Sequence, residues 1–408
     1  MPSFPETVKD RPAGTPLFAG LERLRITAIR SHVLSYPLDE ELGYSQQYYR
    51  ARTAHIVEVQ TSEGITGWGE CFGPGTVALG NRAIVEQTIA PMLVGEDPLA
   101  HEYLWHRVYN LLRDHGQKGM PIQALSGIDI ALWDIAGKVA GLPLYRLLGG
   151  GCRDGIGVYG YGMMLQRVPD LAQRFHDEAA ALIDEPFGGL KMKVGFGVGE
   201  DIKLIEAVRR AVPEDRNMMV DANHAYSIRE AFHVGHACDD MGVYWLEEPL
   251  APEDRAGYRE LRHAIRTNVA GGEAEFTRWG FRDLLAERCV DILQPEVCGL
   301  GGITEYLKVC ALASAHMVPV VNHVWGTAVA VATNMHLLMA QPDMPGGAHP
   351  VRPMLEFDTT PNRFRDDLLL DPLAIRDQLA RTGGIVRPPE RPGLGIEPDP
   401  KFIAAYAV

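Results

Sequence analysis

The stretch from residue 190 to residue 273 contains four short apolar runs, and each ends at or beside a charged side chain: LKMKV (190–194), NMMVDA (217–222), VYWLEE (243–248) and NVAGGE (268–273). Helical periodicity fills the intervals between these runs. A strand, a helix and two short loops need roughly 25–30 residues, which is the observed repeat. The spacing therefore predicts consecutive β-α units around a parallel sheet.

Four further runs extend the pattern in both directions: GVYGYG (157–162), VDILQPE (290–296), VPVVNH (318–323) and MLEFD (354–358). Eight runs predict an α/β fold of the (β/α)8-barrel type, and an open doubly wound sheet is the alternative. Active sites of barrels lie at the carboxyl ends of the strands. The polar residues at seven of these ends are Lys193, Asp221, Glu247, Glu273, Glu296, His323 and Glu356.

The rest of the chain predicts a second domain. Residues 1–23 form a charged, proline-rich leader without an apolar core, so we expect no signal peptide and a disordered or loosely docked segment there. Residues 24–150 are β-rich and then helical, which predicts an α+β capping domain. The barrel is expected over 151–374, and residues 375–408 are expected to return to the capping domain and complete it.

Composition excludes several classes of function. The 408 residues are 46% apolar and 23% charged, and 39 basic against 53 acidic residues give a net charge of −14. This balance argues against nucleic acid and anionic membranes as partners, and the longest apolar stretch is interrupted by polar residues. The six cysteines form no CxxC pair, which indicates reduced thiols and a cytoplasmic protein.

Asp221, Glu247 and Glu273 end three successive predicted strands, so their carboxylates are expected to converge at the barrel mouth. Three carboxylates at one place need either a proton or a cation. A set of oxygen ligands without cysteine or histidine is typical of Mg²⁺, with Mn²⁺ as a substitute.

Two pairs of residues are candidates for acid–base chemistry. Lys191 and Lys193 lie two apart on one strand, so both side chains should point into the barrel and lower each other's pKa. His323 and Glu296 end neighbouring strands, which would let the carboxylate orient the imidazole. Solvated strand lysines and a structural histidine are the alternatives.

Three more residues are candidate substrate contacts, and they follow the ends of two of these strands: Asn223, His224 and Trp325. For His224 and Trp325, ordinary packing is an equally good explanation. The loop 195–199, GFGVG, is similar to a dinucleotide-binding fingerprint. Its third glycine position is Glu200, whose charge opposes a pyrophosphate, so a nicotinamide-dependent enzyme is only an alternative.

In combination these motifs resemble the enolase superfamily, mandelate racemase subgroup. The matching motifs are the KMK of 191–193, the DAN of 221–223, the EEP of 247–249, the GGE of 271–273, and His323 with Glu296. The similarity covers roughly residues 24–400 and includes ALSGIDIALWDIAGK (124–138). Four stretches look closest to galactarolactone cycloisomerases and related acid-sugar enzymes: GFGVGED, DANHAY, NHVWGTA and LEFDTTPNRFR.

The resemblance implies roles for these residues. It implies that Asp221, Glu247 and Glu273 bind the metal. It implies Lys193 as one base with Lys191 as its electrostatic partner, His323 as the acid or base on the opposite face, and Glu356 as a hydrogen-bond partner of the substrate carboxylate. The family usually places aspartate beside this histidine, so Glu296 departs from the pattern by one methylene.

Such a site removes the proton α to a carboxylate, and enolase-superfamily enzymes use a lysine or histidine base with Mg²⁺ for this purpose. We expect a sugar acid or its lactone as substrate, followed by β-elimination or ring opening of the cycloisomerase type. An acid-sugar dehydratase and a racemase or epimerase are alternatives, as is a non-catalytic binding protein. The capping segment 44–52 is expected to shape the substrate pocket, and a homo-oligomer is expected.

Overall fold

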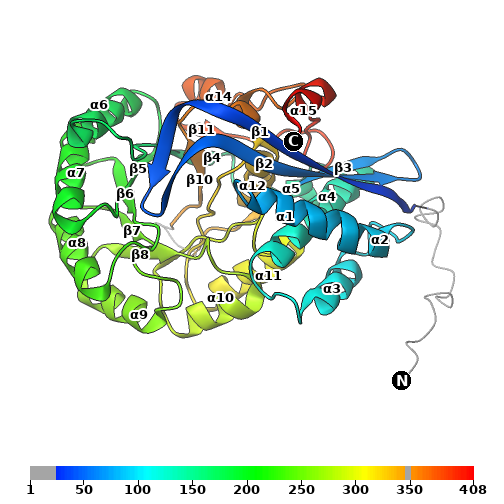
Figure 1. Cartoon of the computed structure of the whole chain (residues 1–408), viewed down its shortest axis with the longest axis horizontal. Helices are drawn as coiled ribbons and strands as arrows, with labels where there is room; N and C mark the ends of the chain where they lie inside the picture. Colours follow the sequence, from blue (N-terminus) through cyan, green and yellow to red (C-terminus); the bar gives the residue numbers. More distant parts are fainter. Residues whose placement is uncertain (1–23, 345–350) are drawn as a thin grey trace.

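The computed structural model describes residues 24–344 and 351–408. The expected leader, 1–23, lies outside the described residues. Within them, the predicted capping domain and barrel-type architecture are confirmed, and Figure 1 shows the two side by side.

The capping domain is an antiparallel three-stranded sheet covered by helices on one face. Its strands, in the order β1-β2-β3, are β1 (Ile26–Tyr44), β2 (Gln47–Thr61) and β3 (Thr66–Cys71). The helices that follow are α1 (Val77–Ile84), the π-helix η4 (Val85–Ile89), α2 (Ala90–Leu93), α3 (His101–Leu112), α4 (Met120–Ala140) and α5 (Leu144–Leu147). Gly67 and Gly69 let α4 approach β3 closely, because a Cβ on Gly69 would lie 1.9 Å from the carbonyl oxygen of Gly127.

The barrel domain contains one curled sheet of parallel strands. Along the chain these are β4 (Ile156–Tyr161), β5 (Gly189–Lys193), β6 (Asn217–Asp221), β7 (Trp245–Glu247), β8 (Asn268–Gly271), β9 (Ile292–Leu293) and β10 (Met354–Asp358), and β10 pairs with β4. The helices outside the sheet are α6 (Leu171–Ile183), α7 (Val198–Ala211), α8 (Ile228–Asp240), α9 (Arg255–Ala264), α10 (Thr277–Ala286), α11 (Gly302–Ala315) and α12 (Ala328–Ala340). The strands are buried on both faces, as expected for a parallel sheet covered by helices.

One predicted strand is not formed. The run VPVVNH follows β9, but it makes a single bridge, between Val320 and Leu293, in place of a ladder. Pro319 has no N–H to donate, and the N–H of Val324 bonds the side chain of Glu356 and not the backbone of β10. The run therefore occupies the expected seventh position without regular strand pairing.

The C-terminal tail contacts both domains. α13 (Arg363–Asp366) follows β10, and the tail, 375–408, contains α14 (Ile375–Thr382), β11 (Ile385–Val386) and α15 (Pro400–Tyr406). β11 pairs with β4 of the barrel, whereas the N–H of Val408 bonds the carbonyl of Val33 in the cap at 2.9 Å. The tail thus returns to the cap as expected and also extends the barrel sheet.

The β1–β2 hairpin extends from the cap over the barrel strands (Figure 1). At its turn, the hydroxyl of Ser45 donates to the carbonyl of Ala222, and the amide of Gln46 donates to the carbonyl of Asn223, both at 2.8 Å. Further along, the buried Arg52 forms an ion pair with Asp358 of β10 at 2.7 Å. These contacts hold the hairpin at the carboxyl ends of β6 and β10.

Among residues 24–344 and 351–408, no helix has the length and apolar character that a membrane crossing needs.

His336 joins the barrel helix α12 to the cap and the tail. Its Nδ1 lies 3.3 Å from the backbone N–H of Tyr145, and its Nε2 lies 3.1 Å from the carbonyl of Leu394. One ring nitrogen must accept and the other must donate, which only the neutral imidazole can do. Burial lowers the pKa of His336 to about 4, and the bond to Leu394 opposes that shift only in part.

We predict that His336 makes the protein sensitive to mild acid. The unfolded chain binds this proton near pH 6.5 and the folded chain only near 4. Stability is therefore lost as pH falls below about 6.5, by about 1.4 kcal/mol per pH unit from this group. The melting temperature of His336→Gln should fall less between pH 6.5 and 5 than that of the wild type. The exposed-site variant His115→Gln should keep the wild-type slope, and equal slopes in all three proteins would contradict the prediction.

Candidate active site

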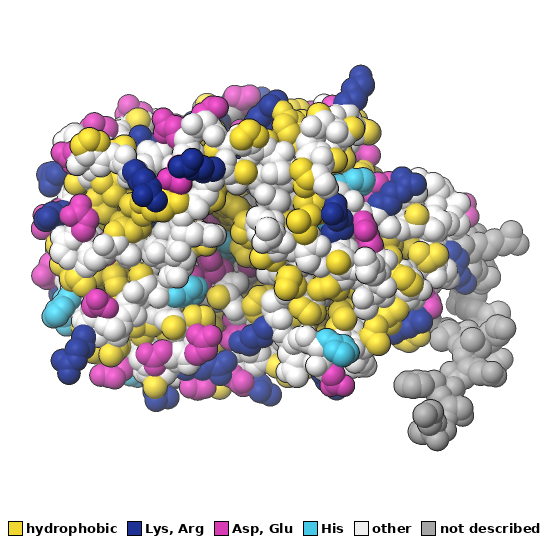
Figure 2. All heavy atoms as spheres, in the orientation of Figure 1, with side chains coloured by type: hydrophobic (Ala, Val, Ile, Leu, Met, Phe, Trp, Pro, Cys, Tyr) yellow, Lys and Arg dark blue, Asp and Glu magenta, His cyan; other side chains and the backbone are white. Residues whose placement is uncertain are grey.

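The three predicted metal ligands meet at the barrel mouth. Parallel pairing places Lys193 beside Asp221 and Asp221 beside Glu247, and Glu273 follows the end of β8. One carboxylate oxygen from each of Asp221, Glu247 and Glu273 lies within 4.8 Å of the others. In the part of the chain that the structure describes, no other group of three such residues meets this condition. Figure 2 shows acidic side chains at the bottom of a hollow near the centre of this face.

The two lysines are buried among carboxylates. Nζ of Lys191 lies 2.7 Å from Glu247 and 2.6 Å from Glu356, and Nζ of Lys193 lies 2.5 Å from Asp221. Both side chains point into the barrel, as predicted. Two lysines against the four carboxylates Asp221, Glu247, Glu273 and Glu356 leave two negative charges, which equals the charge of one divalent cation. The donor set therefore fits Mg²⁺, an oxygen-binding cation.

The prediction that Lys191 and Lys193 lower each other's pKa is wrong, because the carboxylates around them have the larger effect. Burial is the largest single effect on Lys193 and lowers its pKa, but the surrounding negative charges, of which Asp221 is the largest, together raise it. Lys191 behaves in the same way: burial lowers its pKa, and the charges around it, with Glu247 and Glu356 the largest, together raise it. The repulsion between the two ammonium groups is a smaller effect than these contacts.

Glu247 and Glu356 are each held by further donors. The second oxygen of Glu247 accepts from the indole N–H of Trp245 at 2.9 Å and from the amide of Gln294 at 2.7 Å. Even so, burial raises the pKa of Glu247 to about 7, although Lys191 opposes the shift. Glu356 accepts the backbone N–H of Val324 at 2.9 Å. These carboxylates are fixed in place before any substrate binds.

His323 and Glu296 are brought together. Nδ1 of His323 lies 2.7 Å from Glu296, whose other oxygen accepts the N–H of Cys298 at 2.7 Å. Nε2 of His323 lies 3.3 Å from Glu273. Burial lowers the pKa of His323, but Glu273 and Glu296 outweigh burial and raise it to about 10. The extra methylene of Glu296 does not prevent the contact.

The three candidate substrate contacts have different surroundings. Asn223 adopts a left-handed conformation, φ 43°, its N–H bonds Asp221 at 3.0 Å, and its buried Oδ1 has no partner. His224 is held by Glu248 at 3.0 Å. Trp325 lies under the hairpin, where its ring contacts Tyr49 edge-on with centroids 6.5 Å apart. Of the three, only Asn223 presents a free buried polar atom beside the acidic cluster.

Sequence reasoning missed several residues of the site. The rings of Tyr161 and Tyr44 lie 4.9 and 5.9 Å from Nζ of Lys193, and Gln294 bonds Glu247. Tyr161 is the last residue of β4, so the strand-end rule could have found it. Tyr44 begins the segment 44–52 that the sequence predicts to shape the pocket, but no periodic signal marks its place beside Lys193.

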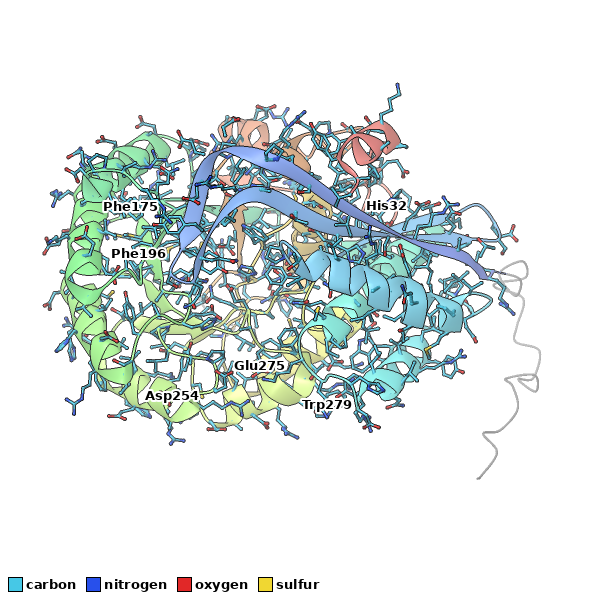
Figure 3. The ribbon with its side chains drawn as sticks, viewed as in Figure 1. His32, Phe175, Phe196, Asp254, Glu275 and Trp279 are labelled. Atoms are coloured by element: carbon cyan, nitrogen blue, oxygen red, sulfur yellow. The ribbon has the colours of Figure 1, made fainter. Side chains whose placement is uncertain are left out.

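The glycine loop does not provide a phosphate site. The carboxylate of Asp201 accepts the backbone N–H groups of Gly195, Phe196 and Gly197 at 3.0, 3.0 and 3.2 Å. Phe196 marks this loop, between β5 and α7, in Figure 3. A pyrophosphate would need the same N–H groups. The dinucleotide interpretation is therefore not supported.

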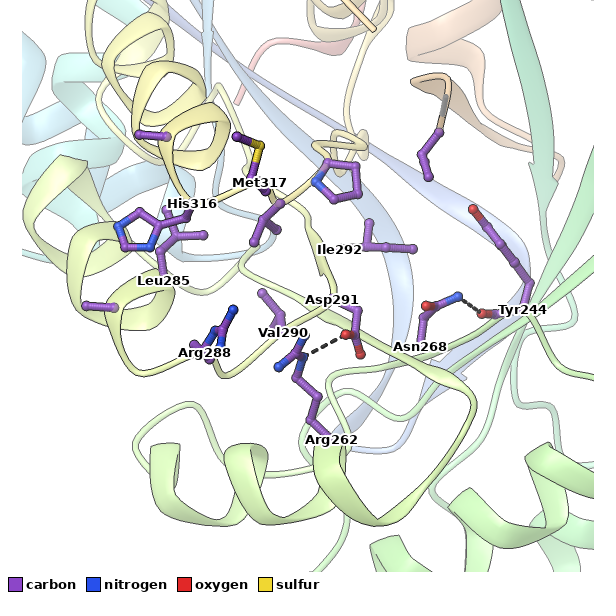
Figure 4. A pocket seen from close by; sticks show the side chains of 15 residues that line it. Tyr244, Arg262, Asn268, Leu285, Arg288, Val290, Asp291, Ile292, His316 and Met317 are labelled. Carbon is purple, nitrogen blue, oxygen red and sulfur yellow. Dashed lines mark hydrogen bonds and ion pairs between the residues drawn. The ribbon is translucent and has the colours of Figure 1, made fainter. Parts of the chain in front are cut away.

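A cavity of about 750 Å³ lies at the opposite end of the barrel (Figure 4). Its lining includes Tyr244, Asn268 and Asp291, which precede or begin β7, β8 and β9. Asp291 is already paired with Arg262 at 2.6 Å. None of the predicted site residues lines this cavity, so the acidic mouth remains the candidate site.

Comparison with known families agrees with this geometry. Residues 174–402 match the model of the enolase C-terminal domain-like family, and residues 43–149 match the mandelate racemase / muconate lactonizing enzyme N-terminal domain. D-galactarolactone cycloisomerase from Agrobacterium fabrum is 41% identical over 377 residues, which is 92% of this chain and 96% of that protein.

Two solved structures are similar over nearly the whole chain. The 3,6-anhydro-D-galactonate cycloisomerase from Zobellia galactanivorans has 34% identity and a TM-score of 0.82, covering 94% of this chain and 99% of that one. The L-talarate/galactarate dehydratase from Salmonella typhimurium, liganded with Mg and L-lyxarohydroxamate, has 27% identity and a TM-score of 0.83, covering 98% and 97%. The chain therefore belongs to the enolase superfamily and is an enzyme with the two domains of its mandelate racemase / muconate lactonizing enzyme members.

Proposed function

We propose that this enzyme removes the proton α to the carboxylate of a sugar acid or its lactone, and that β-elimination or ring opening of the cycloisomerase type follows. The observation that carries the proposal is that one basic side chain lies at each end of the row of carboxylates Asp221, Glu247 and Glu273. Lys193 contacts Asp221 at one end, and His323 contacts Glu273 at the other.

We propose Asp221, Glu247 and Glu273 as ligands of Mg²⁺, with Mn²⁺ as a substitute. When bound, the cation would supply positive charge where negative charge develops on the substrate carboxylate. The unbalanced charge of the buried cluster and the spacing of its oxygens support this assignment. The similar dehydratase from Salmonella typhimurium, whose structure is liganded with Mg, also supports the assignment of a Mg²⁺ site.

The chain's own residues divide the proton transfers. Lys193 is proposed as the base that takes the α-proton, which it can do only as the neutral amine. A divalent cation held by Asp221 would offset the negative charge that raises the pKa of Lys193 and so favour that form. Lys191, between Glu247 and Glu356, holds positive charge beside it. His323 is proposed to deliver a proton from the other side, to the oxygen that leaves the β-carbon. Glu296 holds the tautomer and orientation of His323 through the 2.7 Å contact to Nδ1. Asn223 and Glu356 are proposed to bind the substrate carboxylate; Glu356 would take up a proton as the anionic substrate enters and donate it in this hydrogen bond.

The two outcomes of elimination differ in the leaving oxygen. In both, the α C–H bond and the β C–O bond break and a carbon–carbon double bond forms. A cycloisomerase expels a ring oxygen that stays in the product, whereas a dehydratase expels water. The 41% identity to a cycloisomerase favours the first, and the similarity to a sugar-acid dehydratase makes dehydration the second candidate.

Activity on a panel of mono- and diacid sugars, their lactones and anhydro forms, assayed with Mg²⁺, tests the proposed reaction. A product isomeric with its substrate supports cycloisomerisation, and loss of water supports dehydration. Failure of every sugar acid at saturating Mg²⁺ would contradict the proposed substrate class.

We predict that Mg²⁺ raises the melting temperature and that Glu273→Gln weakens Mg²⁺ binding at least about tenfold, because one charged ligand is lost. Glu273 is only partly buried, so this variant should fold. Isothermal titration calorimetry measures the affinity. The exposed variant Glu260→Gln, on α9, serves as the control, and equal affinities of the two variants would argue against the ligand assignment.

A second prediction separates the role of Lys193 from that of His323. In D2O, NMR should show that Lys193→Ala no longer exchanges the α-proton of an identified substrate. His323→Asn should still exchange it but form product about 10²–10⁴-fold more slowly. Lys203→Ala, at an exposed lysine on α7, is the control. The reverse pattern would exchange the two roles, and unchanged exchange and turnover in both variants would refute the mechanism.

A further inference from the structure

Glu70, at the end of β3 in the capping domain, is buried and reaches into the barrel domain. Its carboxylate accepts three donors at the start of α12: the N–H of Thr327 at 3.0 Å, the hydroxyl of Thr327 at 2.7 Å and the N–H of Ala330 at 2.9 Å. The first N–H groups of a helix have no partner within the helix, so a carboxylate from another domain completes this helix end.

The segment that Glu70 holds is the one that carries His323. Only residues 324–326 separate His323 from Thr327. A Cβ on Gly326 would lie 2.6 Å from Oε1 of Glu70, so the carboxylate is packed directly against this segment. Burial raises the pKa of Glu70 to about 7, while the hydrogen bonds from Thr327 and Ala330 oppose the shift.

The residues that follow Glu70 contact the loop that carries Glu296, the hydrogen-bond partner of His323. The N–H of Phe72 bonds the carbonyl of Cys298 at 2.8 Å, and the N–H of Cys298 bonds Glu296 at 2.7 Å. The ring of Phe72 meets the imidazole of His323 edge-on, with centroids 5.7 Å apart. The end of β3 therefore contacts both the segment that carries His323 and the loop that carries Glu296.

We propose that Glu70 is a positioning residue that sets, from the capping domain, the alignment of His323 with Glu296. The inference rests on the proposed function for its kinetic consequence, because His323 is there assigned the second proton transfer. Its structural content is independent of the substrate. The capping domain would thus contribute to the proton-transfer step, in addition to covering the mouth.

The matched control is Asp129→Asn. Asp129 is also a buried cap carboxylate that reaches the start of a barrel helix, because it accepts the N–H of Thr304 in α11 at 2.8 Å. Among the described residues, Asp129 makes no hydrogen bond to His323 or Glu296, so this variant reports the cost of weakening the interface between the domains alone.

Glu70→Gln should lower kcat about 10- to 100-fold with little change in KM, as expected when a catalytic group is displaced by about 1 Å. Exchange of the α-proton in D2O, assigned to Lys193, should persist. Asp129→Asn should lower the melting temperature comparably and leave kcat near that of the wild type. Kinetic effects no larger in Glu70→Gln than in Asp129→Asn would overturn the proposal.

A readout without substrate separates this proposal from the proposed reaction. The Nδ1 proton of His323 should give a far-downfield NMR signal, identified by its loss in His323→Asn. Glu70→Gln should shift or broaden the signal and Asp129→Asn should not; an unchanged signal in Glu70→Gln would overturn the proposal even if no substrate is found. If Glu70→Gln does not fold, Gly326→Ala, which crowds the same carboxylate, takes its place with the same expected and contradicting results.

Discussion

The site depends on the compensation of buried charge. Four carboxylates and two lysines share a region from which most water is excluded, and unpaired charges there would cost several kcal/mol each. Lys191 bridges Glu247 and Glu356, and Lys193 bonds Asp221, yet two negative charges remain. This remainder is the charge that the proposed divalent cation would neutralise. The parallel register of β5, β6 and β7 builds the arrangement, because it makes Lys193, Asp221 and Glu247 neighbours.

The two domains build the mouth together. The barrel provides the charged floor, and the cap supplies three fixed points around it: Ser45 on the loop after β6, Arg52 on Asp358, and Glu70 on the start of α12. Each is a polar contact made by a buried or half-buried side chain, so the cap is held by directional bonds as well as by apolar packing. A hairpin held in this way limits the space above the lysines, where Tyr44 and Tyr161 face Lys193.

The fold and most of the charged residues could be predicted from the sequence because parallel strands place their carboxyl ends on one edge. The rule located Lys193, Asp221 and Glu247 directly. It could not predict that the N–H of Val324 bonds the side chain of Glu356 in place of the backbone of β10, since that bond joins residues 32 apart. Nor could it predict the direction of the lysine pKa shifts, because the carboxylate distances decide them. Tyr44 and Arg52 bound the segment 44–52 that the sequence predicts to shape the pocket, but their contacts with Lys193 and Asp358 could not be predicted. Glu70 escaped detection because it reaches the barrel from another domain, where strand spacing carries no information.

The most direct test of the charge-compensation account is a crystal structure of the protein grown with Mn²⁺, with anomalous diffraction used to locate the ion. The account predicts one strong peak bounded by carboxylate oxygens of Asp221, Glu247 and Glu273, with Lys191 still paired with Glu356. A protein that crystallises at saturating Mn²⁺ with no peak among these three carboxylates, or with the ion bound elsewhere on the chain, would contradict it.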